Sequence, residues 1–185
     1  MRIAPTLCAA AAALMLAACD STSNDAGGPK SEAAGNAAGD KTIASGLGAD
    51  DSRFADAAKA SGLDATLAGP GPYTVLVPAN SAFDKLPGGV LDTWLEPKSR
   101  AQLTKVLTGH ILPGAILESD IGKAIDNGKG KASLATFGGG TITATREGGK
   151  IILTDSAGGK AAVIAADNKR SNGVVHQVDG ILMPS

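Results

Sequence analysis

Aromatic side chains and an excess of either charge are both scarce in this sequence. Only 3% of its 185 residues are aromatic, and its 17 basic and 18 acidic residues give a net charge of −1. Proteins hold nucleic acids with basic patches and with aromatic side chains on which bases stack. Since the sequence has neither a Lys/Arg-rich run nor many aromatics, we expect no nucleic-acid partner.

Cysteine is equally scarce, and both copies lie near the N-terminus, at Cys8 and Cys19. Arg2 is followed by an apolar run over residues 3–16, which is shorter than the about 20 residues that span a bilayer. A short apolar run behind a basic residue is typical of a secretory signal, so we interpret residues 1–18 as a signal peptide.

The four residues Leu-Ala-Ala-Cys at 16–19 resemble the lipobox of bacterial lipoproteins. This resemblance implies cleavage before Cys19 and a lipid on its thiol, with membrane attachment through that lipid. Cys8 would leave with the signal peptide. The folded domain would then have no disulfide, no cysteine–metal site and no cysteine nucleophile.

Residues 20–42 are Ser, Thr, Asn, Asp, Glu, Gly, Ala and Lys with one Pro, and they contain no large apolar side chain. Such a segment cannot bury enough surface to offset the entropy of ordering it. We therefore predict that residues 19–42 form a lipidated cysteine followed by a flexible tether, with an r.m.s. span of about 25 Å.

Residues 43–185 suit one domain, with helical signals in the first half and strand signals in the second. Helices are predicted after Asp51 or Ser52 with a stop at Gly62, and after Asn80 or Ser81, around 90–95, after Pro97 with a stop at Gly109, and after Ser119. Alternating apolar residues predict strands over 141–145, 151–153 and 161–165. Helices first and strands later indicate an α+β fold with a mixed or antiparallel sheet.

The stretch 172–184, NGVVHQVDGILMP, predicts two short strands joined by a turn at Asp179-Gly180. Val174, His176 and Val178 alternate along the first strand, and 181–183 is a continuous apolar run. Strands that are apolar on both faces belong inside a sheet. The predicted pairing partner is Tyr73 to Val77, far upstream in the chain.

Three patches together are similar to one known family. TVLVPANSAF at 74–83 and NGVVHQVDGILMP at 172–184 resemble the two hallmark boxes of fasciclin-like domains, and HILPG at 110–114 resembles the family's central histidine motif. Gly109 stands where the family usually has Tyr. The resemblance covers roughly residues 42–185 and implies a single wedge-shaped α+β domain that serves adhesion or protein–protein contact without catalysis.

The resemblance also singles out particular residues. It implies an interaction role for the central motif, at His110, Ile111, Leu112 and Pro113. Structural roles are expected for the two boxes, with Asn80 bonding backbone amides at the next helix start and Phe83 packing on the sheet. The box residues are Thr74, Pro78, Asn80, Phe83, Asn172, Gly173, His176 and Asp179.

The sequence lacks the common motifs of catalytic and cofactor-binding sites. The sequence has no G-x-S-x-G elbow, no phosphate-binding glycine loop and no H-E-x-x-H, so we expect no enzyme, no cofactor and no metal. His176 is expected to be a buried residue that holds backbone groups, whereas His110 could be either buried or part of an interface.

The favoured hypothesis is an interaction module, anchored by lipid on the periplasmic or cell-surface side of a bacterial membrane, that contacts a protein or a matrix polymer. One alternative is a carrier of a small apolar or carbohydrate ligand held between helices and sheet. The other is a Ser/His hydrolase, which requires a serine within hydrogen-bond reach of a histidine.

Overall fold

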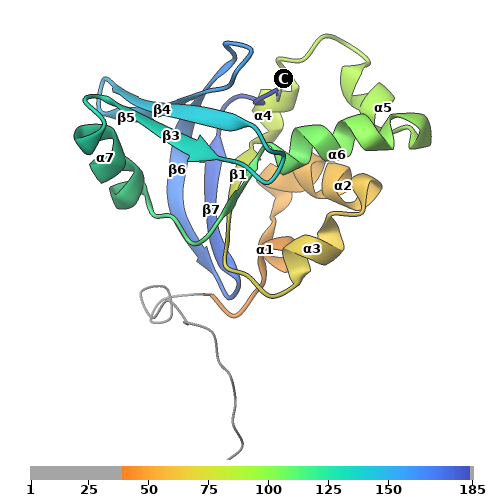
Figure 1. Cartoon of the computed structure of the whole chain (residues 1–185). Coiled ribbons are helices and arrows are strands. Elements are labelled where there is room, and N and C mark those ends of the chain that lie inside the picture. Colours follow the sequence, from red (N-terminus) through yellow and green to blue (C-terminus); the bar gives the residue numbers. More distant parts are fainter. Residues whose placement is uncertain (1–38, 184–185) are drawn as a thin grey trace, which may run out of the picture. The chain divides into compact units, whose positions relative to one another are not determined.

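The structure, a computed structural model, describes residues 39–183, with helices in the first half and a sheet in the second (Figure 1). The helices are α1 (Ile43–Gly46), η2 (Ala49–Asp51), α2 (Ser52–Ser61), α3 (Asp64–Ala68), α4 (Asn80–Phe83), α5 (Val90–Leu95), η3 (Pro97–Ser99), α6 (Arg100–Thr108) and α7 (Glu118–Asn127). The strands are β1 (Tyr73–Pro78), β2 (Ile111–Pro113), β3 (Lys131–Ala135), β4 (Thr141–Glu147), β5 (Lys150–Thr154), β6 (Lys160–Arg170) and β7 (Gly173–Val178). The predicted α+β class is confirmed.

Two of the predicted helices show how local signals set their limits. Helix α2 ends at Gly62, whose left-handed conformation (φ 83°) lets its N–H bond the carbonyls of the last turn. Helix α6 ends at Gly109 and buries Leu103, Val106 and Leu107, the apolar stripe expected from the sequence.

The seven strands form one sheet in the order β2-β1-β7-β6-β5-β4-β3. Strands β1 and β7 are parallel, with Tyr73 opposite Gly173 and Val77 opposite Gln177, and the other neighbours are antiparallel. The predicted pairing of residues 73–77 with the C-terminal strand is therefore confirmed, in parallel orientation.

The sheet curls until its two edges approach each other. The Phe137 N–H, in the turn between β3 and β4, donates to the Ile111 carbonyl of β2 at 2.8 Å. This contact nearly closes the sheet into a barrel. One side of β1 and β7 (Val75, Val77 and Val175) packs on α1 to α6, whereas Leu76 and Val178 point into the barrel interior, which α7 covers.

Asn172 and Gly173 fix the start of β7. The Asn172 amide donates to the carbonyls of Leu67 and Gly69 at 2.8 Å each and accepts from the Ile43 N–H at 2.8 Å. At Gly173 the backbone of β1 is so close that a Cβ would lie 1.9 Å from the Tyr73 carbonyl oxygen. Only glycine fits there, and Asn172 joins the last strand to the first helices.

The C-terminal segment, residues 181–183, is not a strand, so the predicted second strand is wrong. The Leu182 N–H donates to the His110 imidazole at 3.1 Å, and the Met183 N–H donates to the Asp155 carboxylate at 2.6 Å. Side chains, rather than a neighbouring strand, satisfy these two backbone donors.

Two predicted helix caps are also corrected. Asn80 does not cap α4: its side-chain oxygen accepts from the Arg53 N–H at 3.1 Å, at the start of α2. Ser119 lies inside α7, whose first N–H, that of Glu118, donates to Asp167 of β6 at 2.8 Å. Asn80 of α4 thus caps α2, and Asp167 of β6 caps α7.

The folded body begins earlier than expected. Gly39 bridges to Arg170, and the Lys41 carbonyl accepts from the Ser171 N–H at 3.1 Å, so residues 39–42 belong to the domain rather than to the tether. The predicted signal peptide and Cys19 lie outside the described residues. Within residues 39–183, no helix has the length and apolar character needed to cross a bilayer.

Replacing Gly173→Ala should lower the free energy of unfolding by about 3 kcal/mol, because the new methyl group forces β7 away from β1. Urea unfolding followed by circular dichroism measures this change. Gly48→Ala is the matched control, since a Cβ there meets no atom within 4 Å. Equal stability of the two variants would contradict the close approach at Gly173.

Candidate functional site

His110 is buried (1% exposed) between α6 and the C-terminal segment. Its Nδ1 lies 2.9 Å from the Val106 carbonyl oxygen, and its Nε2 accepts from the Leu182 N–H at 3.1 Å. A carbonyl can only accept, so Nδ1 carries the proton and the ring is neutral. Burial lowers the pKa of His110 below its ordinary value of 6.5, opposed by the Val106 carbonyl and by the negative charge of Asp155.

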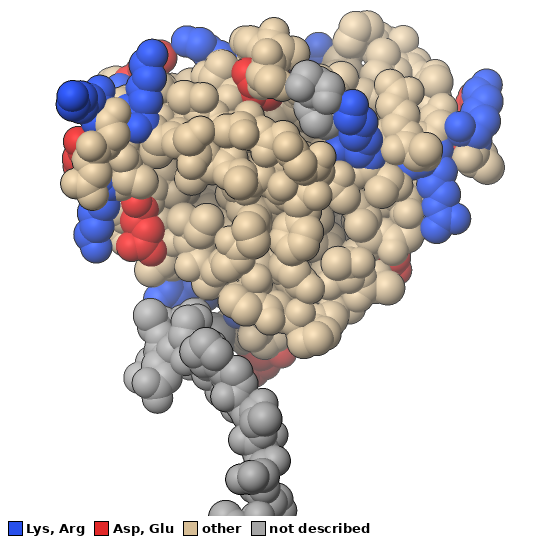
Figure 2. Space-filling model, in the orientation of Figure 1, with Lys and Arg blue, Asp and Glu red and all other residues tan. Residues whose placement is uncertain are grey.

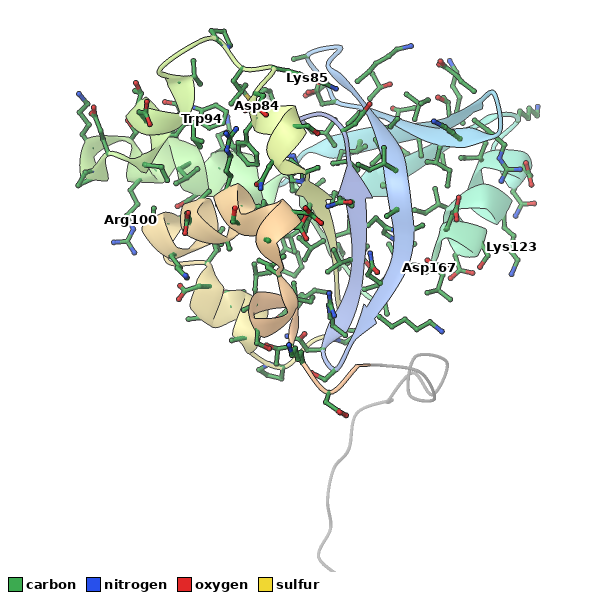
Figure 3. All side chains as sticks on the ribbon, turned by 180° about the vertical axis from the view of Figure 1, so that it is seen from behind. Asp84, Lys85, Trp94, Arg100, Lys123 and Asp167 are labelled. Atoms are coloured by element: carbon green, nitrogen blue, oxygen red, sulfur yellow. The ribbon has the colours of Figure 1, made fainter. Side chains whose placement is uncertain are left out.

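His176 is fully buried in the middle of β7. Its Nε2 donates to the Ile116 carbonyl at 2.8 Å, and its Nδ1 accepts from the Asp167 N–H at 3.3 Å. Asp167 has a positive φ (57°) and faces α7 from the sheet side, as Figure 3 shows from behind. His176 therefore joins the chain before α7 to the bend in β6, as expected for a buried histidine that holds backbone groups.

Both imidazoles are thus occupied by backbone groups. A Ser/His hydrolase requires a serine hydroxyl within hydrogen-bond reach of a histidine ring. The hydrogen bonds of these two rings to described residues all go to backbone groups, and none of them involves a serine side chain. Within residues 39–183, no three His, Cys, Asp or Glu side chains come together as metal ligands.

The central motif is mostly inside the molecule. His110, Ile111 and Leu112 are at most 3% exposed, and only Pro113 is exposed. The sequence-based expectation of a contact patch made by these four side chains needs correction, because three of them cannot reach a partner in this structure. Backbone pairing and the burial of Ile111 and Leu112 hold β2 beside β1, whereas the His110 ring joins α6 to the C-terminal segment.

The two boxes supply internal connections. Thr74 donates its hydroxyl proton to the Gly114 carbonyl at 2.7 Å and accepts from the Ile116 N–H at 2.8 Å, which holds the segment after β2. Asp179 accepts from the Ala162 N–H of β6 at 2.7 Å. Pro78 ends β1, and Phe83 is buried in the core on the helical side of the sheet.

A surface that was not predicted from the sequence lies where three charge-free segments meet. Residues 65–83, 106–117 and 132–145 contain no Asp, Glu, Lys or Arg. Pairing of β1 with β2 brings the first two together, and the Phe137–Ile111 hydrogen bond adds the third. The sequence contains these three long charge-free segments, but no sequence pattern indicates that they lie side by side in the fold.

We call this surface the uncharged face, and define it by Pro70–Tyr73, Pro113 and Phe137–Gly139. Phe137 is 54% exposed, and its ring meets Tyr73 edge-on, with centroids 5.7 Å apart. Tyr73 lies opposite Pro113 in the sheet. In the orientation of Figure 2, charged side chains gather around the margin of the molecule and leave the middle of this side free of charge.

A separate hollow of about 300 Å³ lies between α1, α2 and α3. Alanine is the most frequent residue in its lining, and the small alanine side chains leave the space open, while Leu47 and Leu67 add to this apolar lining. Lys59 and Asp64 are the charged residues that line it. The hollow is bounded by the three helices and by Thr42 and Leu47, which flank α1, and no strand residue lines it, whereas the carrier hypothesis placed its ligand between helices and sheet.

Comparison with known proteins agrees with this architecture. The Fasciclin domain profile matches residues 49–184. Protein sll1483 of Synechocystis is 34% identical over 128 residues, which cover 69% of this chain and 64% of that protein. The pig transforming growth factor-beta-induced protein ig-h3 is 33% identical over 129 residues, covering 69% of this chain and 17% of that protein. This chain therefore spans less than two thirds of the length of these relatives.

Among solved structures, a FAS1 domain pair from the insect cell adhesion molecule Fasciclin I superimposes with a TM-score of 0.67 at 18% identity, covering 77% of this chain and 51% of that one. The family is associated with adhesion and protein interaction and is generally non-catalytic. The profile match over most of the chain, together with the nearly closed mixed sheet, shows that this protein belongs to the fasciclin domain family.

Proposed function

We propose that this protein is a membrane-tethered interaction module that binds a protein or matrix polymer through its uncharged face and performs no catalysis. The observation that carries the proposal is the exposed Phe137 ring, which packs against the partly buried Tyr73 on a surface built from three charge-free segments. The two buried histidines, both engaged by backbone groups, support a role that does not depend on acid–base chemistry.

The uncharged face has the composition of a protein interface core. Such cores are depleted in charged residues and enriched in aromatics, and polar residues form the rim around them. A charged group pressed against this face would lose its hydration without gaining a partner, which is costly. The partner surface should therefore be uncharged as well. Without Lys or Arg, the face offers no attraction to nucleic acid.

The anchor in this proposal is the lipid on Cys19, suggested by the lipobox-like residues 16–19. Two or more acyl chains hold a protein stably on a membrane, whereas one chain is marginal. The module would then stand in the cell envelope, on the periplasmic or cell-surface side of a bacterial membrane.

A second candidate function is suggested by the hollow between α1, α2 and α3. Its volume of about 300 Å³ lies at the lower limit for small-molecule pockets, about 300–1,000 Å³. Its apolar lining favours a compact apolar ligand. In this alternative the protein carries a small molecule in addition to, or instead of, contacting a partner.

Replacing Phe137→Lys in the full-length anchored protein should reduce recovery of its crosslinked neighbours from intact cells at least about tenfold. A tenfold loss corresponds to about 1.4 kcal/mol, which is modest for a charge placed in an interface core. Quantitative mass spectrometry of the affinity-purified protein gives the recovery.

Ile164→Lys is the matched control, because Ile164 is the other large exposed apolar residue of the described chain (48%) and lies on β6, outside the uncharged face. It should leave recovery unchanged. Neighbours recovered equally with both variants would remove the uncharged face from the proposal.

Replacing Cys19→Ser should abolish labelling of the protein by radioactive palmitate and move it from the membrane fraction to the soluble fraction. Cys8→Ser should change neither result, since Cys8 would leave with the signal peptide. Palmitate labelling that persists in Cys19→Ser would disprove the anchor without bearing on the contact face.

If the hollow holds a ligand, native mass spectrometry of the purified protein should show an added mass of small-molecule size. Ala55→Leu narrows the hollow from α2 and should abolish that added mass while leaving the helical circular dichroism unchanged. A single bare mass in the unmodified protein would argue against the carrier alternative.

A further inference from the structure

The C-terminal segment closes the barrel at the point where it meets His110. Leu182 is 2% exposed and belongs to the apolar cluster of the barrel interior, together with Leu153 and Ile142. The backbone on either side of the Leu182 side chain is held by two titratable residues, His110 and Asp155, rather than by strand pairing. The attachment of this segment therefore depends on the protonation of side chains.

The geometry at His110 allows only one protonation state. Nδ1 must donate, because it faces the Val106 carbonyl oxygen at 2.9 Å, and Nε2 must accept, because it faces the Leu182 N–H at 3.1 Å. A proton added to the ring can go only to Nε2. It would set one N–H donor against another and leave the Leu182 N–H buried without an acceptor, which destabilises the closed arrangement.

Asp155 connects the other half of the segment to the turn after β5. One of its carboxylate oxygens accepts from the Met183 N–H at 2.6 Å, and the other accepts from the N–H groups of Ala157 and Gly159 at 2.9 and 2.7 Å. Its negative charge also acts on the His110 ring. Asp155 is thus fixed by the turn and keeps its place when the segment leaves.

We propose that residues 181–183 are an acid-sensitive closure of the barrel. Protonation of His110 at Nε2 removes the acceptor of the Leu182 N–H and releases the segment, and the release exposes the apolar cavity that the Leu182 side chain fills in the closed state. The released state exposes an imidazole and a leucine site that the closed state buries. This inference concerns the domain alone and does not depend on the lipid anchor or on the uncharged face.

The sign of the pH effect follows from linkage. In the closed state burial keeps the pKa of His110 below 6.5, whereas in the released state the ring is exposed and regains its ordinary pKa. The released state therefore binds more protons below pH 6.5. The opening equilibrium should rise by up to about tenfold per pH unit as the pH falls from 6.5 toward the pKa of the closed state, and should be constant above about pH 7.5.

Amide hydrogen exchange of the full chain, followed by NMR between pH 7.5 and 4.5 and corrected for intrinsic exchange rates, tests this inference. The protection of the Leu182 and Met183 amides should fall with pH by up to about tenfold per unit, while the β7 amide of Val175 stays protected. In His110→Gln, whose side chain does not titrate, the protection of Leu182 should no longer depend on pH.

Two further measurements keep the test decisive if His110→Gln does not fold. In the unmodified protein, the ring signals of His110 and the Leu182 amide should titrate with one common midpoint. Asp155→Asn removes the charge that favours protonated His110, so the midpoint of the His110 ring signals should move to lower pH. Because the single amide oxygen cannot accept from both the Met183 N–H and the turn N–H groups, the protection of Met183 should also fall at every pH in this variant. A Leu182 amide that follows the His176 ring instead, or a loss of Val175 protection over the same pH range, would overturn the proposal.

Discussion

The structure depends on the parallel pairing of β1 with β7. These two strands are neighbours inside the sheet, with β2 beyond β1 and β6 beyond β7. Both are buried on both faces, which is why their sequences do not alternate between apolar and exposed polar residues. The two faces of β1 point into different cores: Val75 and Val77 pack against the helices, and Leu76 packs in the barrel interior. Asn172 and Gly173 set this pairing, because the amide of Asn172 holds the first helices and Gly173 lets the two backbones approach.

The polar side chains of the two boxes and of the histidines form hydrogen bonds mainly with backbone groups. Seven buried or partly buried side chains each bond main-chain groups of a distant segment: Thr74, Asn80, His110, Asp155, Asp167, Asn172 and His176. Because buried N–H and carbonyl groups must be paired, these contacts satisfy the loops and helix ends that strand pairing leaves open. The polar residues that resemble catalytic groups are thereby used for the fold, and the contact that we propose is assigned instead to the uncharged face.

Much of the fold could be predicted from local signals. Gly62 ends α2 in the left-handed conformation that favours glycine, and α6 ends at the expected Gly109, although that residue stays right-handed (φ −65°). The stripe Leu103, Val106 and Leu107 predicted the buried face of α6. The pairing of residues 73–77 with the C-terminal strand followed from their shared apolar character. His176 was expected inside, and the structure places it there.

Contacts between distant residues could not be predicted in this way. Asn80 caps a helix that begins 28 residues earlier, at Ser52, and Asp167 caps one that begins 49 residues earlier, at Glu118. Residues 181–183 were predicted as a strand because they are apolar. Their burial was correctly indicated, but the acceptors for their N–H groups are side chains. The uncharged face was missed because each of its three segments looks like ordinary core or turn sequence on its own.

The position of β7 in the chain has a consequence for biogenesis. The parallel pair β1 and β7 joins residues separated by 100 positions, Tyr73 and Gly173, so β1 lacks one of its two neighbours until residues 173–178 have been synthesised. Contacts of such sequence separation slow folding, because the loop must close before they form. The sheet of this domain therefore stays incomplete in a nascent chain until β7 has been made, however early β1 and the helices are synthesised.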